Sequence, residues 1–190
     1  TTQTVLEQVS AAELLEFVRA YIRRDRDFAL ALKTWFAGSL SGTDNPFLLL
    51  LESALPRQGA SGGKPLREPD LRRLRKMLDD LEIQLSAATG QGNARTVFQI
   101  ATAVLQKILP LLPKTAENRR EQLTQYCQKA LHDLIQLAPE QLSPELRENR
   151  RSFLMELART GSLPVELERD MIHFLGQAAT DDRFFGQIRD

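Results

Sequence analysis

The cysteine and histidine residues that could bind a metal in this 190-residue sequence are few. They comprise one cysteine, Cys127, and two histidines, His132 and His173. Cys127 and His132 are five positions apart, so on a helix their side chains diverge by about 140° and cannot share a ligand face. No CxxC or HxxxH spacing occurs, so we expect no structural zinc site built by this chain alone.

A second arrangement of this kind is Asp170 with His173, a carboxylate and an imidazole three positions apart on one helix face. Di-iron helical bundles use such pairs, but they need two of them plus further inward glutamates. The sequence supplies one pair. We therefore expect a histidine beside an acidic neighbour, with no metal and no cofactor.

Nucleophilic catalysis would have to use Cys127. It falls in the apolar stripe of its predicted helix, where a cysteine is ordinarily a small buried hydrophobic residue. His132 and Asp133 are adjacent, so on a helix they point about 100° apart and do not form a base with its orienting carboxylate. Residues 59–64 (GASGGK) lack the spacing of a phosphate-binding loop. We predict that the protein is not an enzyme; an enzyme with an unrecognised site in a bundle core stays the second alternative.

Arginine pairs are the sequence feature that most favours binding. They fall near the ends of predicted helices, at Arg23-Arg24, Arg72-Arg73, Arg119-Arg120 and Arg150-Arg151. One interpretation is structural, because Arg23 and Arg24 complement a helix C-terminus and the other pairs have glutamates beside them. The other interpretation makes these eight arginines a partner-binding surface that contacts an acidic protein or a phosphate backbone.

The first arginine pair belongs to the run RRDRD, which separates two amphipathic stripes with helical spacing. The stripes are Leu14, Phe17, Val18, Tyr21 and Ile22 before it, and Phe28, Ala31, Leu32, Trp35 and Phe36 after it. Ser10 and Glu13 have the spacing of a capping box at the start of the first helix. We predict an antiparallel helix pair that buries both stripes, with Asp25 or Asp27 capping the second helix at the corner.

Helical periodicity continues through the rest of the chain. Pro46 is placed to open a short apolar helix that ends near Pro56, and residues 57–68 are predicted to form a flexible linker. A leucine seam then begins near Pro69, which we interpret as helix packing or a docking stripe. Its members are Leu71, Leu74, Leu78, Leu81 and Leu85.

Three further helices and a final pair are expected after this seam. The segment 94–112 is apolar on more than one face and should be a central buried helix, and the next should span 116–137. Ser143-Pro144-Glu145 starts another that stops at Gly161, and a last pair runs from Pro164. Strand alternation is missing from the sequence. We predict an all-α fold of about seven to nine helices, arranged as antiparallel pairs in a bundle or short right-handed α-solenoid, with parts 1–56 and 69–190 packed as one unit.

Composition bears on three properties of the protein: nucleic-acid binding, cellular location and membrane association. Lys+Arg and Asp+Glu each number 25, so the chain lacks the basic excess usual in nucleic-acid proteins. The single cysteine suits a reducing compartment, and we expect a cytoplasmic location. No purely apolar run is longer than FLLLL at 47–51, so we expect no membrane partner. The chain begins without Met, which suggests a processed product or a piece of something longer.

Two internal echoes point to helix pairs that stack. The motif ENRR occurs at 117–120 and again at 148–151, and Phe17, Asp25, Arg26 and Phe28 match Phe174, Asp182, Arg183 and Phe185. Helix pairs of this size resemble HEAT- or armadillo-type repeat modules in architecture. The stretch FVRAYIRRDRDFALALKTWF is also similar to helical regions of bacterial proteins that carry a SWIM zinc-chelating module. That similarity covers the first helix pair alone, and the Cys and His ligands of such a module are absent from it.

These observations favour a non-enzymatic helical interaction or scaffold module. Its partner would be another protein or other domains of a longer chain to which it belongs. The first alternative is a nucleic-acid accessory domain that uses the arginine pairs, for which phosphate contacts would make affinity fall steeply with salt.

Overall fold

The computed structural model describes residues 2–36, 45–55, 67–160, 163–165, 167–169 and 171–172. Within these ranges the chain forms α-helices and short 3-10 turns and contains no strand, which confirms the predicted all-α fold. The predicted linker 57–68 and the last helix pair fall largely outside the described residues. Asp170, His173 and the C-terminal copy of the second echo, at 174–185, also fall outside them.

The N-terminal helices are α1 (Thr2–Gln8), α2 (Ala11–Ile22), α3 (Arg26–Trp35) and α4 (Pro46–Ala54). The capping box of α2 is present, because Ser10 N–H donates to a Glu13 carboxylate oxygen at 3.0 Å and Glu13 N–H donates to the Ser10 hydroxyl at 3.3 Å. The hydrogen bonds from Ser10 lower the pKa of the Glu13 carboxyl. Pro46 opens α4 as predicted, with Asn45 accepting from the first free N–H groups.

The remaining helices are α5 (Glu68–Gly90), α6 (Ala94–Ile108), α7 (Glu117–Ile135) and α8 (Pro144–Arg159), with 3-10 turns η2 (Leu109–Lys114) and η3 (Pro139–Gln141). The chain reverses between α5 and α6 at Gly92, whose φ of 68° is a conformation that side chains with a Cβ rarely adopt. Helix α6 ends four residues before the predicted boundary, because Pro110 and Pro113 lack the N–H groups that would continue it.

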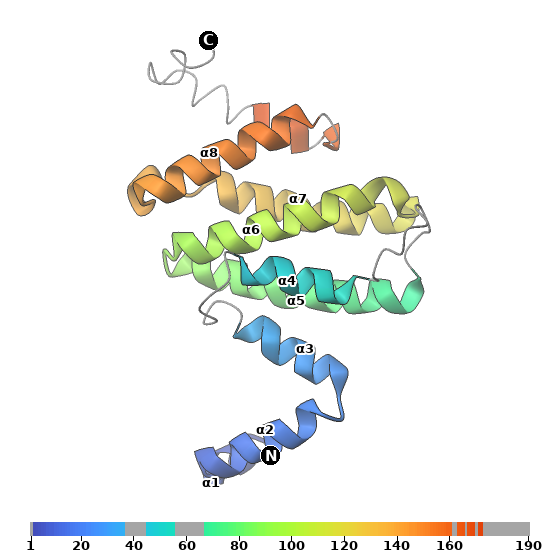
Figure 1. Cartoon of the computed structure of the whole chain (residues 1–190), viewed down its shortest axis with the longest axis vertical. Helices are drawn as coiled ribbons and strands as arrows, with labels where there is room; N and C mark the ends of the chain where they lie inside the picture. The colour runs from blue at the N-terminus through green and yellow to red at the C-terminus, as the bar shows by residue number, and fades with distance from the viewer. Residues whose placement is uncertain are drawn as a thin grey trace.

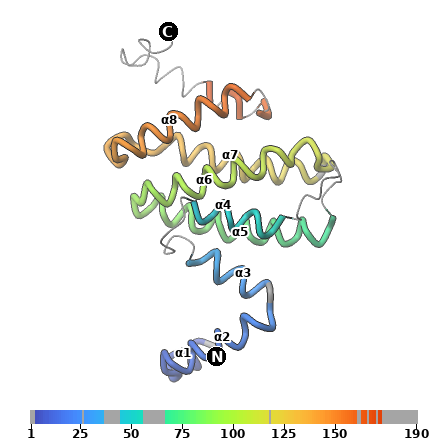
Figure 2. Tube along the Cα trace, viewed as in Figure 1, coloured from blue at the N-terminus to red at the C-terminus, as the bar shows by residue number. Residues whose placement is uncertain are grey.

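The helices stack in layers along the long axis of the molecule (Figure 1). Helices α1 and α2 lie at one end, α3 follows, α4 and α5 lie side by side, and α6, α7 and α8 complete the stack (Figures 1 and 2). Helix α6 makes extensive contacts with α4, α5 and α7. Its Ile100, Leu105 and Ile108 have no exposed surface, so α6 is the central buried helix that the sequence predicts.

The leucine seam of α5 is part of this core. Leu74, Leu78, Leu81 and Leu85 are each at most 2% exposed, and Leu71 is 4% exposed. Their side chains pack inside the fold, so the seam offers no exposed stripe for a partner. Its interpretation as helix packing holds, and its use as a docking stripe is wrong.

One stretch within the described ranges, Ala94–Lys114, is long and apolar enough to cross a bilayer. Most of it, 61% of its most apolar window, is buried inside the fold. Polar residues, among them Arg95, Gln106 and Lys107, interrupt this stretch, so it contains no long purely apolar run. A buried core helix meets the same two criteria of length and composition.

Burial of Cys127 makes the free energy of unfolding depend on pH. The side chain has no exposed surface, and desolvation raises the pKa of the thiol to about 12, whereas a free thiol has a pKa of about 8.5. Above pH ~8.5 the unfolded chain releases this proton and the folded chain keeps it. The free energy of unfolding should therefore fall by about 1.4 kcal/mol per pH unit between these two pKa values.

The measurement is urea unfolding of the wild type and of Cys127→Ala at pH 7 and pH 10. The wild type should lose about 2 kcal/mol more than the variant over this interval. Equal losses would show that the thiol ionises in the folded protein.

Candidate protein-docking surface on the N-terminal helices

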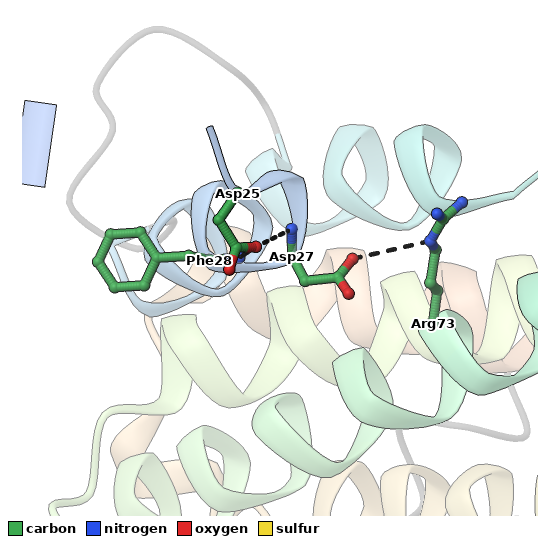
Figure 3. Close-up of polar contacts among 4 residues, drawn as sticks. All are labelled: Asp25, Asp27, Phe28 and Arg73. Carbon is green, nitrogen blue, oxygen red and sulfur yellow. Dashed lines mark hydrogen bonds and ion pairs between the residues drawn. The ribbon is translucent and has the colours of Figure 1, made fainter. Parts of the chain in front are cut away.

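The corner between α2 and α3 is held by Asp25. One carboxylate oxygen accepts from the backbone N–H groups of Asp27 and Phe28, both at 2.9 Å (Figure 3). The backbone N–H groups of Arg24 and Asp25 both donate to the Tyr21 carbonyl at 2.9 Å and close α2. Of the two predicted cap residues, Asp25 is therefore the N-cap of α3.

Asp27 has a different role, because it reaches from α3 to α5. Its carboxylate lies 3.7 Å from Nε of Arg73, and both side chains are about half exposed (Figure 3). Leu30 of α3 packs against the core, and Thr34 is buried and donates its hydroxyl to the Leu30 carbonyl at 2.9 Å. One face of α3 therefore attaches the N-terminal helices to α5.

Two open cavities flank this attachment. One of about 140 Å³ lies between α3 and α5 and is lined in part by Ala31, Thr34 and Met77. The other, of about 160 Å³, lies between α3 and the end of α4 and is lined in part by Lys33 and Ser53. Both are lined by Asp27 and Arg73, so the ion pair between α3 and α5 borders each of them.

Helix α2 contradicts the expectation that its stripe is buried. None of its residues is buried, and its main helical neighbour is α3. Phe17 is 58% exposed and Tyr21 is 40% exposed, and the other stripe residues are exposed or half-buried. We call this set the α2 apolar face: Leu14, Leu15, Phe17, Val18, Tyr21 and Ile22.

An aromatic row fixes the direction of this face. The rings of Phe17 and Tyr21 stack with centroids 5.5 Å apart, and Tyr21 meets Phe28 of α3 edge to face at 5.0 Å. Such pairs are worth about 0.5–1.5 kcal/mol beyond the area that they bury. The row thus locks α2 against α3 while leaving Phe17 in solvent.

Helix α3 extends the apolar surface on its outer side. Trp35 lies seven positions, about two turns, after Phe28 and so on the same side of α3, and it is 65% exposed. The following residue, Phe36, is exposed as well. The prediction that the second stripe would be buried is thus wrong for its C-terminal end, because the side of α3 that packs on α5 carries Leu30 and Thr34 instead.

The arginine pairs are spread over several sites. Arg72 and Arg119 both pair with Glu68, at the N-terminus of α5, and Arg73 pairs with Asp27. Arg23 and Arg24 are exposed at the α2–α3 corner. Arg120 donates to the Thr115 carbonyl at 3.3 Å, and Arg151 lies 3.9 Å from Glu148. These contacts bring Arg72 and Arg119 together at the Glu68 carboxylate, whereas Arg73, Arg120 and Arg151 each have a different partner.

The prediction that Arg150 is part of the binding surface is wrong, because its side chain is buried and the residue is only 8% exposed. It donates to the carbonyl of Leu137 beyond the end of α7, and its neighbour Arg147 donates to the Pro139 carbonyl at 2.9 Å. Burial, and then the charge of Arg147, lower the pKa of Arg150. Arg150 therefore holds α8 to the turn after α7.

The ENRR echo does not give equivalent environments. Its first copy begins α7, whereas its second lies in the middle of α8, so Arg119 is on the surface where Arg150 is buried. Within the described ranges, no three His, Cys, Asp or Glu side chains gather where they could hold a metal ion. His132 is exposed and Cys127 is buried, so the structure does not bring these two side chains together.

The two acidic residues of the corner should differ in their effect on stability. Asp25→Ala removes two backbone hydrogen bonds at an N-cap and should lower the free energy of unfolding by about 1 kcal/mol. Asp27→Ala removes only an exposed ion pair and should cost less than about 0.5 kcal/mol. Urea unfolding of both variants measures the difference. An equal cost for the two would contradict the assignment of Asp25 as the cap.

Arg150 and Arg72 provide a second contrast between arginines. Arg150→Ala leaves the Leu137 carbonyl without this donor and should cost about 1–3 kcal/mol. Arg72→Ala removes an exposed pair with Glu68 at 3.9 Å and should cost less than about 0.5 kcal/mol. The same unfolding measurement tests both. A near-zero cost for Arg150→Ala would show that its bond to α7 contributes nothing.

No family model, curated protein or solved structure matches this chain. A fold alone does not assign a function, so the function is inferred below from the residues exposed on the surface.

Proposed function

We propose that the protein is a non-enzymatic helical interaction module, and that the α2 apolar face docks onto another protein chain. One observation carries this proposal: α2 is a well-capped helix whose apolar residues are all exposed or only half-buried, and none is buried by the described part of the chain. The layered helices behind it serve as the scaffold that presents this face.

The energetics support a partner for this face. A helix of 12 residues is marginal by itself in water, and most helices in proteins are stabilised by packing of their apolar side. Burying a large apolar side chain contributes about 1.5–3 kcal/mol. Covering Phe17 and the leucines of α2 would supply this stabilisation on binding.

The residue types also support a protein partner. Aromatic residues are enriched at the centres of protein interfaces, and Phe17, Tyr21 and Trp35 are all exposed here. The stacking of Phe17 on Tyr21 fixes these rings before binding. A surface that is already ordered loses less conformational entropy when a partner arrives.

The arginine pairs favour this proposal over nucleic-acid binding. Arg72, Arg73 and Arg119 lie against carboxylates, and Arg150 is buried. The net charge is zero, so the chain supplies no general attraction to phosphate. The resemblance to HEAT- or armadillo-type modules and the similarity to helical regions of SWIM-containing proteins stay predictions.

Site-specific photo-crosslinking tests the proposal. Replacing Phe17 with p-benzoylphenylalanine in the protein expressed in its native host should give a crosslinked product that contains a second polypeptide, identified by mass spectrometry. The matched control replaces Ile83, which is 60% exposed on α5 against 58% for Phe17. The same low yield of product at both positions would contradict a docking role for the α2 apolar face.

A further inference from the structure

We infer that the α2 apolar face binds the same face of a second copy of this chain, with the two α2 helices antiparallel across a two-fold axis. This inference rests on the proposed function, because it names the occupant of the face proposed there. It follows from the distribution of charge and of side-chain size along α2.

The charges of α2 are divided between its two halves. Glu13 and Glu16 lie in the N-terminal half, whereas Arg19 lies in the last turn and Arg23 follows the helix. Antiparallel pairing of two copies places the acidic half of each beside the basic end of the other. Parallel pairing would place like charges together, which is unfavourable. The charge pattern is therefore self-complementary in one orientation.

The apolar residues are self-complementary in the same orientation. A two-fold axis that passes between Phe17 and Val18 sets Phe17 of one copy against Val18 of the other. The same axis sets Leu14 against Tyr21, because the two lie at equal distances on either side of it. Each aromatic ring then meets an aliphatic side chain, so large and small residues alternate across the contact. Such alternation is how closely packed helices interdigitate.

The position of α2 leaves room for this contact. Helices α1 and α2 lie at the end of the molecule opposite α8, so a contact made through α2 is far from α7 and α8 (Figure 1). The corner bonds of Asp25 and the ring contact between Tyr21 and Phe28 hold α2 in a set direction. Each copy thus presents the face already formed.

The size of the face sets the strength of the contact. A stable interface of standard size buries about 800 Å² per partner, and each large aromatic residue supplies at most about 150–250 Å². Phe17 and Tyr21 are 58% and 40% exposed, so together they supply roughly 150–250 Å², and the contact is smaller than a standard interface. We expect a reversible dimer with a Kd on the order of micromolar.

Sedimentation equilibrium of the purified chain tests the inference at concentrations from about 1 to 200 μM, the range that brackets this Kd. The wild type should move from monomer to dimer as concentration rises. Phe17→Glu should stay monomeric, because it places a charge in the centre of the contact. Ile83→Glu should dimerise like the wild type. Circular dichroism of each variant shows whether the helices are kept.

Charge-swapped variants test the orientation. Arg19→Glu/Arg23→Glu makes α2 acidic throughout, and Glu13→Gln/Glu16→Lys makes it basic while a glutamine keeps the capping box. Each variant alone should bind itself at least ten-fold more weakly than the wild type binds itself. An equimolar mixture should regain dimers, which are then heterodimers. Variants that dimerise as the wild type does, or a mixture that stays monomeric, would overturn the antiparallel pairing.

The two proposals fail in different ways. A wild type that stays monomeric at 200 μM, well above the Kd expected from the size of the contact, overturns self-pairing. If the photo-crosslink at position 17 then joins a different polypeptide, the docking face stands with another occupant. If position 17 also gives no more product than position 83, the proposed function fails as well. A crosslink between two copies of this chain, together with a concentration-dependent dimer, supports both.

Discussion

The fold depends on the exclusion of water from α6. Ile100, Ala101, Leu105 and Ile108 have no exposed surface, and this helix can reach that state only if other helices cover it on several sides. Helices α4, α5 and α7 provide that cover, and the leucine seam of α5 is buried as a result. The turns at Gly92 and at η2 let α5, α6 and α7 run back and forth beside one another. Most of the apolar surface of this central part is therefore buried within the chain, and Leu49 and Ile83 are exposed exceptions.

The N-terminal helices follow a different principle. Their shape is set by polar end groups and ring contacts, namely the Ser10–Glu13 box, the Asp25 cap and the row from Phe17 to Phe28, while burial contributes little to α2. Helix α3 connects α2 to the buried central helices, because one of its sides packs on α5 and the other contacts α2. The chain therefore buries most of its apolar side chains in the central helices and leaves those of α2 exposed or half-buried.

Helix starts were predictable from the sequence because their signals are local. Ser10 with Glu13, Pro46, and Ser143 with Pro144 each fix a boundary through atoms a few residues apart. Local signals of this kind do not predict whether an apolar stripe is buried or exposed in the folded chain. The spacing of Phe17, Tyr21 and Trp35 shows that one side of a helix is apolar, but not whether the chain supplies cover for it. Arg150 and Arg119 occupy the same motif, but only Arg150 is buried, and it donates to the Leu137 carbonyl, which lies 13 residues earlier in the chain.

The joint between α3 and α5 has a mechanical consequence. The cap at Asp25 is made of short bonds to the backbone, whereas the tie from Asp27 to Arg73 is a half-exposed contact of 3.7 Å between long or flexible side chains. A force applied to α2 would therefore meet a stiff elbow first and a compliant attachment second. Helices α2 and α3 would move together on α5, restrained there by the packing of Leu30 and Thr34 beside the two open cavities.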